Sequence, residues 1–176
     1  MGENFNNTQF SSVYMPPGQK LPDWVYKDSR PETDLEYFSN MTRCIFQGGL
    51  NWVMIANKWP NFLKAFDGFD IDKVAAYGLD DQERLKNDAG IIRNRQKIMA
   101  TIQNAEEFQR IRKEHGSFQK WLDSLDNSNN YKVVIGRLKM RFKRVGPSTA
   151  HIFLWSIGEP IEYDTSVFTR QPKKVA

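Results

Sequence analysis

The residues best suited to do chemistry lie near the end of the chain, in a turn and in the carboxylate that follows it. Arg144-Val-Gly-Pro-Ser-Thr-Ala150 places a tight Gly-Pro turn between a basic segment and an apolar one. A helix that begins at such a turn has free backbone N–H groups pointing outward, and these groups bind anions. Asp164 follows fourteen residues after Ala150 and would start the next element. We therefore predict an anion site with a carboxylate beside it.

Positive charge is concentrated next to this turn. The net charge of +4 and the pI near 9.1 are mild for a nucleic-acid-binding protein, so the distribution of charge matters more than its total. From Lys132 to Arg144 there are six Lys or Arg and no Asp or Glu. Such a run is often only a solvated helix face, but its position beside the turn favours contact with phosphate.

The sequence offers little for metal binding or membrane insertion. Cys44 is the single cysteine, and His115 and His151 are the two histidines, so we expect no disulfide, no metal site and no cofactor. No apolar run reaches transmembrane length, and the first residues are polar. We expect a soluble cytoplasmic protein without a membrane partner.

The pattern of apolar residues predicts an all-α fold. Residues 1–30 read as an extended N-terminal arm pinned by aromatic side chains, and residues 31–176 read as a single helical domain. Thr33-Asp-Leu-Glu36 has the form of a capping box that begins the first helix. Further helices are expected over 50–59 up to Trp59-Pro60, after Asn61, Asp70 and Asp80, over 91–112, around 118–122 and over 131–143.

The turn resembles the hairpin of the helix-hairpin-helix DNA-binding motif, here near residues 137–158. In that motif the glycine permits the sharp reversal, and the next helix presents N–H groups to a DNA phosphate. The segment from Ile152 to Thr165 continues the pattern of the helix-hairpin-helix DNA glycosylase superfamily, in which an Asp at the place of Asp164 is essential. The resemblance implies DNA phosphate contacts by Arg141, Lys143, Arg144, Gly146, Ser148 and Thr149.

Three segments in the middle of the chain resemble DNA-3-methyladenine glycosylase type I, and this likeness runs from about Pro31 to Gly158. They are Phe46-Gln-Gly-Gly-Leu-Asn-Trp52, Phe66-Asp-Gly-Phe-Asp-Ile-Asp-Lys-Val-Ala-Ala76 and Asn87-Asp-Ala-Gly-Ile-Ile-Arg-Asn-Arg-Gln-Lys-Ile98. The resemblance implies hydrolysis of the bond between deoxyribose and an alkylated or otherwise modified base in double-stranded DNA. We expect a monomer associated with the nucleoid.

The chain departs from that family at several positions. The family holds a structural zinc with Cys and His near both ends, and this chain has neither residue there. The family's base-recognising Glu lies eight residues before Trp52, where this chain has Cys44, which puts recognition of 3-methyladenine in doubt. The predicted base pocket consists of Trp52, which matches the pocket aromatic of the family, together with Cys44, Gln47, Phe46 and Tyr26.

Most of these residues also have a purely structural interpretation. Trp52 is either a stacking surface for a flipped base or part of the core, and Gln47 either binds a base edge or caps a helix. Tyr26 is either pocket wall or an anchor, and Cys44 reads as a small hydrophobic residue rather than a nucleophile.

Asp164 is the predicted catalytic residue, although Asp-Thr-Ser-Val is also a good helix-capping sequence. Ser148 stands where bifunctional superfamily members carry a nucleophilic Lys, so a monofunctional enzyme without lyase activity is expected. The alternative is a non-catalytic DNA-binding protein that keeps the scaffold.

Overall fold

Helices provide all the regular secondary structure of the part of the chain that the computed structural model describes, residues 20–168. The prediction of an all-α fold is therefore confirmed for these residues. The helices are α2 (Asp34–Gln47), α3 (Trp52–Ala65), the short 3-10 helix η1 (Asp67–Phe69), α4 (Ile71–Ala75), α5 (Leu79–Asn87), α6 (Arg95–His115), α7 (Phe118–Asp123), α8 (Ser128–Arg141), α9 (Pro147–Ser156) and α10 (Thr165–Phe168).

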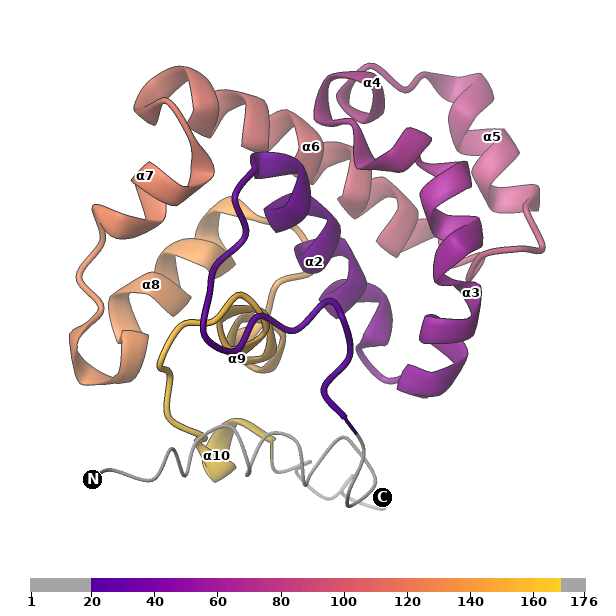
Figure 1. Cartoon of the computed structure of the whole chain (residues 1–176). Helices are drawn as coiled ribbons and strands as arrows, with labels where there is room; N and C mark the ends of the chain where they lie inside the picture. Colours follow the sequence, from indigo (N-terminus) through magenta and orange to yellow (C-terminus); the bar gives the residue numbers. More distant parts are fainter. Residues whose placement is uncertain (1–19, 169–176) are drawn as a thin grey trace, which may run out of the picture.

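Two helices lie at the centre of the molecule and the others surround them. Figure 1 shows α2 and α9 in the middle, with α3, α4 and α5 on one side and α7 and α8 on the other. The long helix α6 runs behind both groups and contacts α2, α4, α5 and α7. The core between them is rich in aromatic rings, since Phe38, Phe108 and Phe118 are fully buried. This packing holds the ends of α2 and α9 next to each other.

The capping residues predicted from the sequence are present at several helix starts. The Thr33 side chain accepts a hydrogen bond from the backbone of Glu36, and the Glu36 carboxylate accepts one from the Thr33 backbone, which completes the capping box of α2. Asp70 caps α4 by accepting from the Lys73 backbone. These bonds satisfy N–H groups that a helix start leaves free.

Some expected boundaries were wrong, because tertiary packing overrides local signals. Helix α3 continues through Pro60 to Ala65 and does not end at Trp59-Pro60. The Trp59 ring stacks on Phe62 and Phe69, and this burial compensates for the hydrogen bond that a proline removes. Asn61 consequently lies inside α3, α5 begins at Leu79 rather than after Asp80, and α6 begins at Arg95 with Asn94 as its cap.

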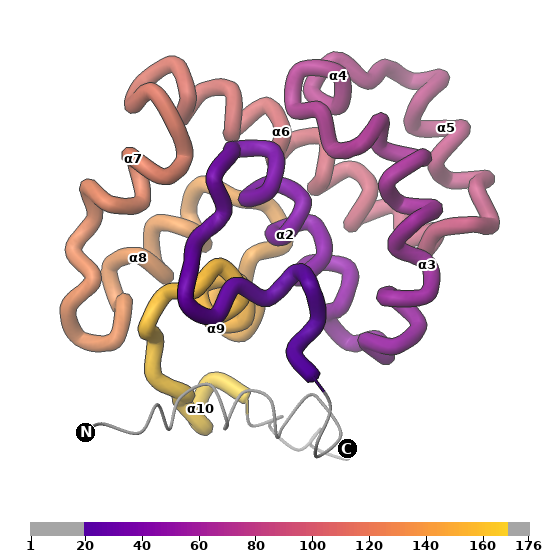
Figure 2. Tube along the Cα trace, viewed as in Figure 1, coloured from indigo at the N-terminus to yellow at the C-terminus, as the bar shows by residue number. Residues whose placement is uncertain are grey.

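The segment from residue 20 to residue 30 is fixed to the end of α9. The Tyr26 backbone N–H donates to Ser156 O at 2.8 Å, and the Asn40 amide donates to Trp24 O at 2.8 Å. Gly158 has φ +85 and a Cβ there would lie 2.1 Å from Ser29 O, so only glycine fits. Figure 2 shows that the described chain begins and ends on the same side of the molecule, near α10. The rest of the proposed N-terminal arm, residues 1–19, lies outside the described residues.

Candidate nucleic-acid interface and base pocket

The connection between α8 and α9 forms a tight hairpin. Helix α8 ends at Arg141, Phe142 and Val145 are buried, and α9 begins with Gly146 as its N-cap and Pro147 in its first turn. Because no side chain caps α9, its first backbone N–H groups are available at the surface. Ser148 and Thr149 follow in this first turn. The hairpin thus has the backbone arrangement that binds a phosphate.

The glycine of this hairpin does not make the reversal, contrary to expectation. Gly146 has φ −84 and ψ 179, which any residue adopts, and a Cβ there would meet no atom within 4 Å. The left-handed residue is instead Arg144, with φ 62, an uncommon conformation for a side chain of this kind. Folding therefore does not require glycine at 146. The missing side chain keeps the start of α9 open to a close approach from outside.

A buried asparagine on α6 holds the hairpin in place. Asn104 is 1 % exposed, and its amide donates to Lys143 O at 3.1 Å and accepts from Lys143 N at 2.7 Å. The backbone before Arg144 is thereby fixed to the long helix. The Lys143 and Arg144 side chains remain exposed.

The hairpin also borders a hollow of about 540 Å³ beside the start of α6. Arg95, Lys143 and Arg144 contribute positive charge to it, and none of the described residues that line it is acidic. The hollow extends the predicted phosphate-binding surface to α6. Arg141 faces elsewhere, since its guanidinium pairs with Glu107 and, at 3.0 Å, with Glu114.

A second cavity, with a volume of about 890 Å³, lies on the other side of the hairpin. It is bounded by the end of α2, the loop after it, the start of α3, the first turns of α9, and α10. None of the described residues that line it carries a charged side chain. The lining residues are Cys44, Gln47, Gly48, Gly49, Leu50, Asn51, Trp52, Val53, Ser148, Thr149, Ile152, Tyr163, Thr165, Val167 and Phe168.

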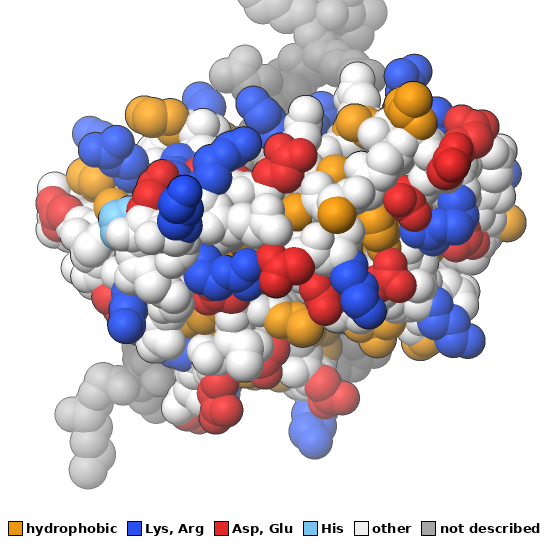
Figure 3. Space-filling view, turned by 90° about the horizontal axis from the view of Figure 1, so that it is seen from above, with side chains coloured by type: hydrophobic (Ala, Val, Ile, Leu, Met, Phe, Trp, Pro, Cys, Tyr) orange, Lys and Arg blue, Asp and Glu red, His pale blue; other side chains and the backbone are white. Residues whose placement is uncertain are grey.

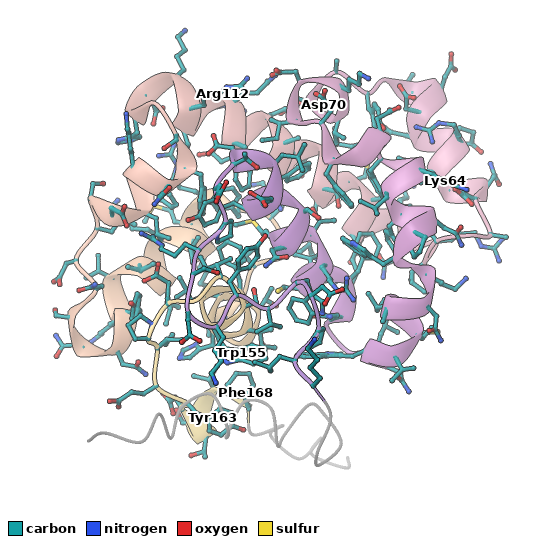
Figure 4. The ribbon with its side chains drawn as sticks, in the orientation of Figure 1. Lys64, Asp70, Arg112, Trp155, Tyr163 and Phe168 are labelled. Atoms are coloured by element: carbon teal, nitrogen blue, oxygen red, sulfur yellow. The ribbon has the colours of Figure 1, made fainter. Side chains whose placement is uncertain are left out.

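The cavity has an aromatic wall on two sides. Trp52 is half-buried and packs edge-on against Trp24, with ring centroids 5.7 Å apart. Tyr163 and Phe168 stack with centroids 5.1 Å apart and rings almost parallel, and the Phe168 ring lies edge-on to His151 of α9 with centroids 5.9 Å apart. Figure 4 labels both rings beside α10. Aromatic surfaces at the mouth of an uncharged cavity suit a flat heterocyclic ring.

The structure brings three of the five predicted pocket residues into this cavity. Trp52, Cys44 and Gln47 line it, together with Ser148 and Thr149 from the hairpin. Phe46 is fully buried against Phe62 and lies outside the lining. Tyr26 also lies outside, where its hydroxyl donates to Glu36 Oε1 at 3.3 Å.

Cys44 and Gln47 form the floor of the cavity, and both are almost completely buried. The Cys44 thiol lies 4.0 Å from Ser156 Oγ, and burial raises the pKa of this thiol to about 12. A thiol with such a pKa is not a nucleophile at neutral pH. Gln47 is 2 % exposed, and neither its amide oxygen nor its amide nitrogen has a hydrogen-bond partner among the described residues. No pattern in the sequence indicated that this amide would be left unpaired.

Two buried cationic side chains, Arg43 and Lys97, lie behind this floor, and neither was predicted from the sequence. The Arg43 guanidinium lies between the rings of Trp24 and Trp59, 4.9 and 4.8 Å from their centroids. Lys97 donates from Nζ to Phe46 O at 3.2 Å and to Gly48 O at 2.7 Å, which fixes the loop after α2. Lys97 lies on the buried face of α6, directly before Ile98. A lysine at a buried position of a helix is unusual, and this could have indicated its role from the sequence.

Asp164 stands at the start of α10 and caps it. Its Oδ1 accepts hydrogen bonds from Ser166 N at 2.9 Å and from Ser166 Oγ at 2.6 Å. These bonds, with a smaller contribution from His151, hold the pKa of the Asp164 carboxyl below its usual range. Asp164 itself does not line the cavity, but its neighbours Tyr163 and Thr165 do. The carboxylate is therefore ionised at neutral pH and lies close to the cavity rim.

The face of the molecule far from α10 differs from this region. Figure 3 views it from above, and Lys or Arg side chains there alternate with Asp and Glu. Arg112, for example, pairs with Asp72. Mixed charges of this kind give no continuous positive surface for a nucleic acid.

The residues present do not fit a structural zinc. Within residues 20–168, no group of three or more His, Cys, Asp or Glu side chains is placed to hold a metal ion. His151 is engaged through Nδ1 with Pro147 O at 2.9 Å. Among the same residues, no helix combines the length and the apolar character needed to cross a membrane.

Comparison with known proteins agrees with this geometry. The family model for methyladenine glycosylase matches residues 24–135. DNA-3-methyladenine glycosylase 1 of Escherichia coli (strain K12) is 47 % identical over 77 residues, which are 43 % of this chain and 41 % of that enzyme. The DNA-3-methyladenine glycosylase of Haemophilus influenzae is 26 % identical over 130 residues, 64 % of this chain and 70 % of that protein.

Solved structures show the same fold. A crystal structure of 3-methyladenine DNA glycosylase I superposes with a TM-score of 0.66 and 26 % identity, covering 79 % of this chain and 93 % of that one. The prediction of a helix-hairpin-helix glycosylase fold is confirmed by this similarity. Since the family model spans more than half of the sequence, the chain belongs to the methyladenine glycosylase family.

Proposed function

We propose that this protein is a DNA glycosylase, which hydrolyses the N-glycosidic bond of an alkylated or otherwise modified base in double-stranded DNA. The observation that carries the proposal is the position of the cavity. A space of about 890 Å³ with aromatic walls, whose described lining residues carry no charge, shares Ser148 and Thr149 with the hairpin, and the free N–H groups of that hairpin suit a phosphate. A hairpin that grips the backbone next to a flipped nucleotide would place the base in that space.

The hairpin supplies the grip on DNA. We assign phosphate contact to the backbone of Gly146, to Ser148 and Thr149, and to the exposed side chains of Lys143 and Arg144. We do not include Arg141, because its guanidinium is already paired with two glutamates.

Trp52 then stacks on the extruded base, and Asp164 acts on the sugar. As the bond from C1′ to the base nitrogen breaks, positive charge develops on the sugar, and a nearby carboxylate stabilises it. The electron pair of the bond passes to the base nitrogen. A water oxygen then bonds to C1′, and one proton of that water goes to Asp164 or to solvent.

The chemistry stops at the abasic site. Ser148 occupies the hairpin position that a Schiff-base Lys would need, so no covalent enzyme-sugar intermediate forms and the strand is not cut. The enzyme acts as a monomer, and its DNA substrate places it at the nucleoid.

The proposal is tested with Asp164→Asn. The amide oxygen that this substitution introduces still accepts the bonds from Ser166, so the helix cap and DNA affinity should persist while base release falls by about 10²–10³-fold. The assay incubates duplexes containing modified bases with protein and then nicks abasic sites with alkali. Unchanged turnover would remove Asp164 from the mechanism. DNA binding without base release by the unmodified protein would support the alternative of a non-catalytic DNA-binding protein, which the family match does not favour.

A further inference from the structure

The hollow beside the start of α6 carries positive charge that no ion pair neutralises within residues 20–168. Arg95, Lys143 and Arg144 line it with exposed side chains, and none of these three side chains has a hydrogen-bond or ion-pair partner among the described residues. Glu83 on α5 is near enough to sense Arg95, but Lys86 and Asn87 bind its carboxylate and lower its pKa ahead of Arg95. The three cations of the hollow are therefore free to meet an anion.

The first turn of α6 holds positive charge at the helix end that disfavours it. Arg95 is the first residue of α6, Lys97 is the third, and no acidic residue lies in this turn. The N-terminus of a helix carries a partial positive charge, so cations there are unfavourable. The first turns of α2 and α5 follow the usual rule and carry two acidic residues each. A local rule broken in this way is typical of a functional site.

The hairpin brings further positive charge to the same place. Burial lowers the pKa of Lys97, and repulsion by Arg144 lowers it further, so these two cations are close enough to interact. Arg144 also has a φ of 62, which is costly for a residue other than glycine. Folding alone does not explain why these cations gather here, whereas an anion in the hollow would offset their repulsion.

The hollow also offers hydrogen-bond donors that suit a phosphate. Asn94 caps α6 by accepting from Lys97 N at 3.0 Å, which leaves the backbone N–H groups of Arg95 and Gln96 without a partner inside the helix. Gln96 and Gln103 both line the hollow and stand seven residues apart, so their amides share one face of α6. A phosphodiester accepts hydrogen bonds from amide and guanidinium groups and is attracted by their charge.

The hairpin separates this hollow from the base cavity. Arg144 borders the hollow, and Ser148 and Thr149, four and five residues later, border the cavity. A duplex that is held at the start of α9 with its extruded base in the cavity lies next to the hollow. A neighbouring phosphate of that duplex can then reach α6.

We propose that Arg95, with Gln96 and Gln103, forms a second phosphate-binding site on α6, which binds a different backbone phosphate of the duplex from the one at the start of α9. The site deepens the proposed function and rests on it, because the duplex must first be held by the hairpin. Arg95 adds affinity but touches neither the base nor its sugar.

Arg95→Gln tests the charge of this site. The slope of log duplex affinity against log salt concentration should become shallower by about 1, and affinity at low salt should fall about three- to tenfold. Base release at saturating protein should stay within about twofold of the unmodified rate. The melting temperature should rise slightly, because a positive charge leaves the helix start. Arg95→Lys should restore the salt slope.

Arg112→Gln is the matched control, because it removes the same charge from the same helix about 25 Å away along its axis. Arg112 pairs with Asp72 on the face far from α10, so its removal should leave affinity and salt slope unchanged. Equal effects of Arg95→Gln and Arg112→Gln would show a response to net charge alone and would overturn the inference.

Duplexes with one phosphate at a time replaced by an uncharged methylphosphonate locate the contact. The unmodified protein should lose affinity at one linkage to which Arg95→Gln is insensitive, and at another linkage to which Gly146→Ala is insensitive. The inference fails if no linkage couples to Arg95, or if Arg95 and Gly146 couple to the same one. It also fails if Arg95→Gln weakens binding of inorganic phosphate but not of the duplex, since the hollow would then serve a free anion. Base release by the unmodified protein, measured on the same duplexes, tests the proposed function separately.

Discussion

The hairpin and the cavity floor lie side by side but recognise their ligands by opposite means. The hairpin offers backbone N–H groups and exposed lysine and arginine side chains, none of which distinguishes one nucleotide from another. The floor offers a buried amide and a buried thiol, with two buried cations behind it. In the proposed function, the first arrangement would provide affinity for any duplex, and the second would provide selection among bases.

The two regions also differ in how they are supported. The hairpin is held by Asn104, which donates a hydrogen bond to Lys143 O and accepts one from Lys143 N. The floor is held by Lys97, which donates to Phe46 O and Gly48 O. Both supporting side chains come from α6, which runs behind the whole molecule (Figure 1). One helix, α6, therefore positions both the hairpin and the cavity floor. Each of the two supporting side chains can be removed separately.

Removing the support of the hairpin should have the largest effect. Asn104→Leu removes two part-buried hydrogen bonds to the backbone N–H and C=O of Lys143, and should lower the free energy of unfolding by about 1–3 kcal/mol. Affinity for any duplex should fall with it. Urea denaturation and fluorescence anisotropy measure the two quantities. Asn87→Leu, on the surface of α5, is the control and should change stability by less than about 0.5 kcal/mol. Equal effects of the two substitutions would contradict this role for Asn104.

Removing the support of the floor should instead separate catalysis from binding. Lys97→Met keeps the length of the side chain but frees the loop after α2, so base release should fall by about 10–100-fold while duplex affinity stays within about twofold. Single-turnover rates at saturating protein give the first value. Lys113→Met on the exposed side of α6 should leave both unchanged. A parallel loss of affinity would show that floor and hairpin are not independent.

The hairpin and the cavity floor also differ in how far they could be predicted from the sequence. The hairpin is formed by consecutive residues, from Arg144 to Thr149, so its position could be predicted from the sequence alone. The cavity floor is assembled from α2 and α6 residues about fifty positions apart, and the sandwich of Arg43 between Trp24 and Trp59 depends on contacts that no local pattern encodes. The course of α3 through Pro60 was also missed, since the Trp59 ring packs against Phe69 in η1, a contact outside its own helix.

A substitution at Gly146 tests whether a phosphate approaches the hairpin backbone closely, and its expected effect is smaller. Gly146→Ala adds a methyl group where no protein atom lies within 4 Å and where φ is ordinary, so stability should not fall. The methyl group should nevertheless block close approach of a phosphate and lower duplex affinity by about tenfold, equivalent to about 1.4 kcal/mol. Gly136→Ala, on the exposed face of α8 and equally free of contacts, should raise stability slightly and leave affinity unchanged. If Gly146→Ala lowered the melting temperature without weakening binding, the glycine would be structural.

The smallest expected effect concerns the exposed charges of the hairpin. Lys143→Gln removes one phosphate contact, so the slope of log affinity against log salt concentration should become shallower by about 1, with the same change for every duplex sequence. Lys64→Gln, exposed on α3 and away from the hairpin (Figure 4), should leave the slope unaltered. The relative rates of release of different bases should stay the same in both variants, because Lys143 belongs to the hairpin and not to the cavity floor. A shift in base preference on removing Lys143 would mean that charge outside the cavity also takes part in selection, and the division of labour between the two regions would no longer hold.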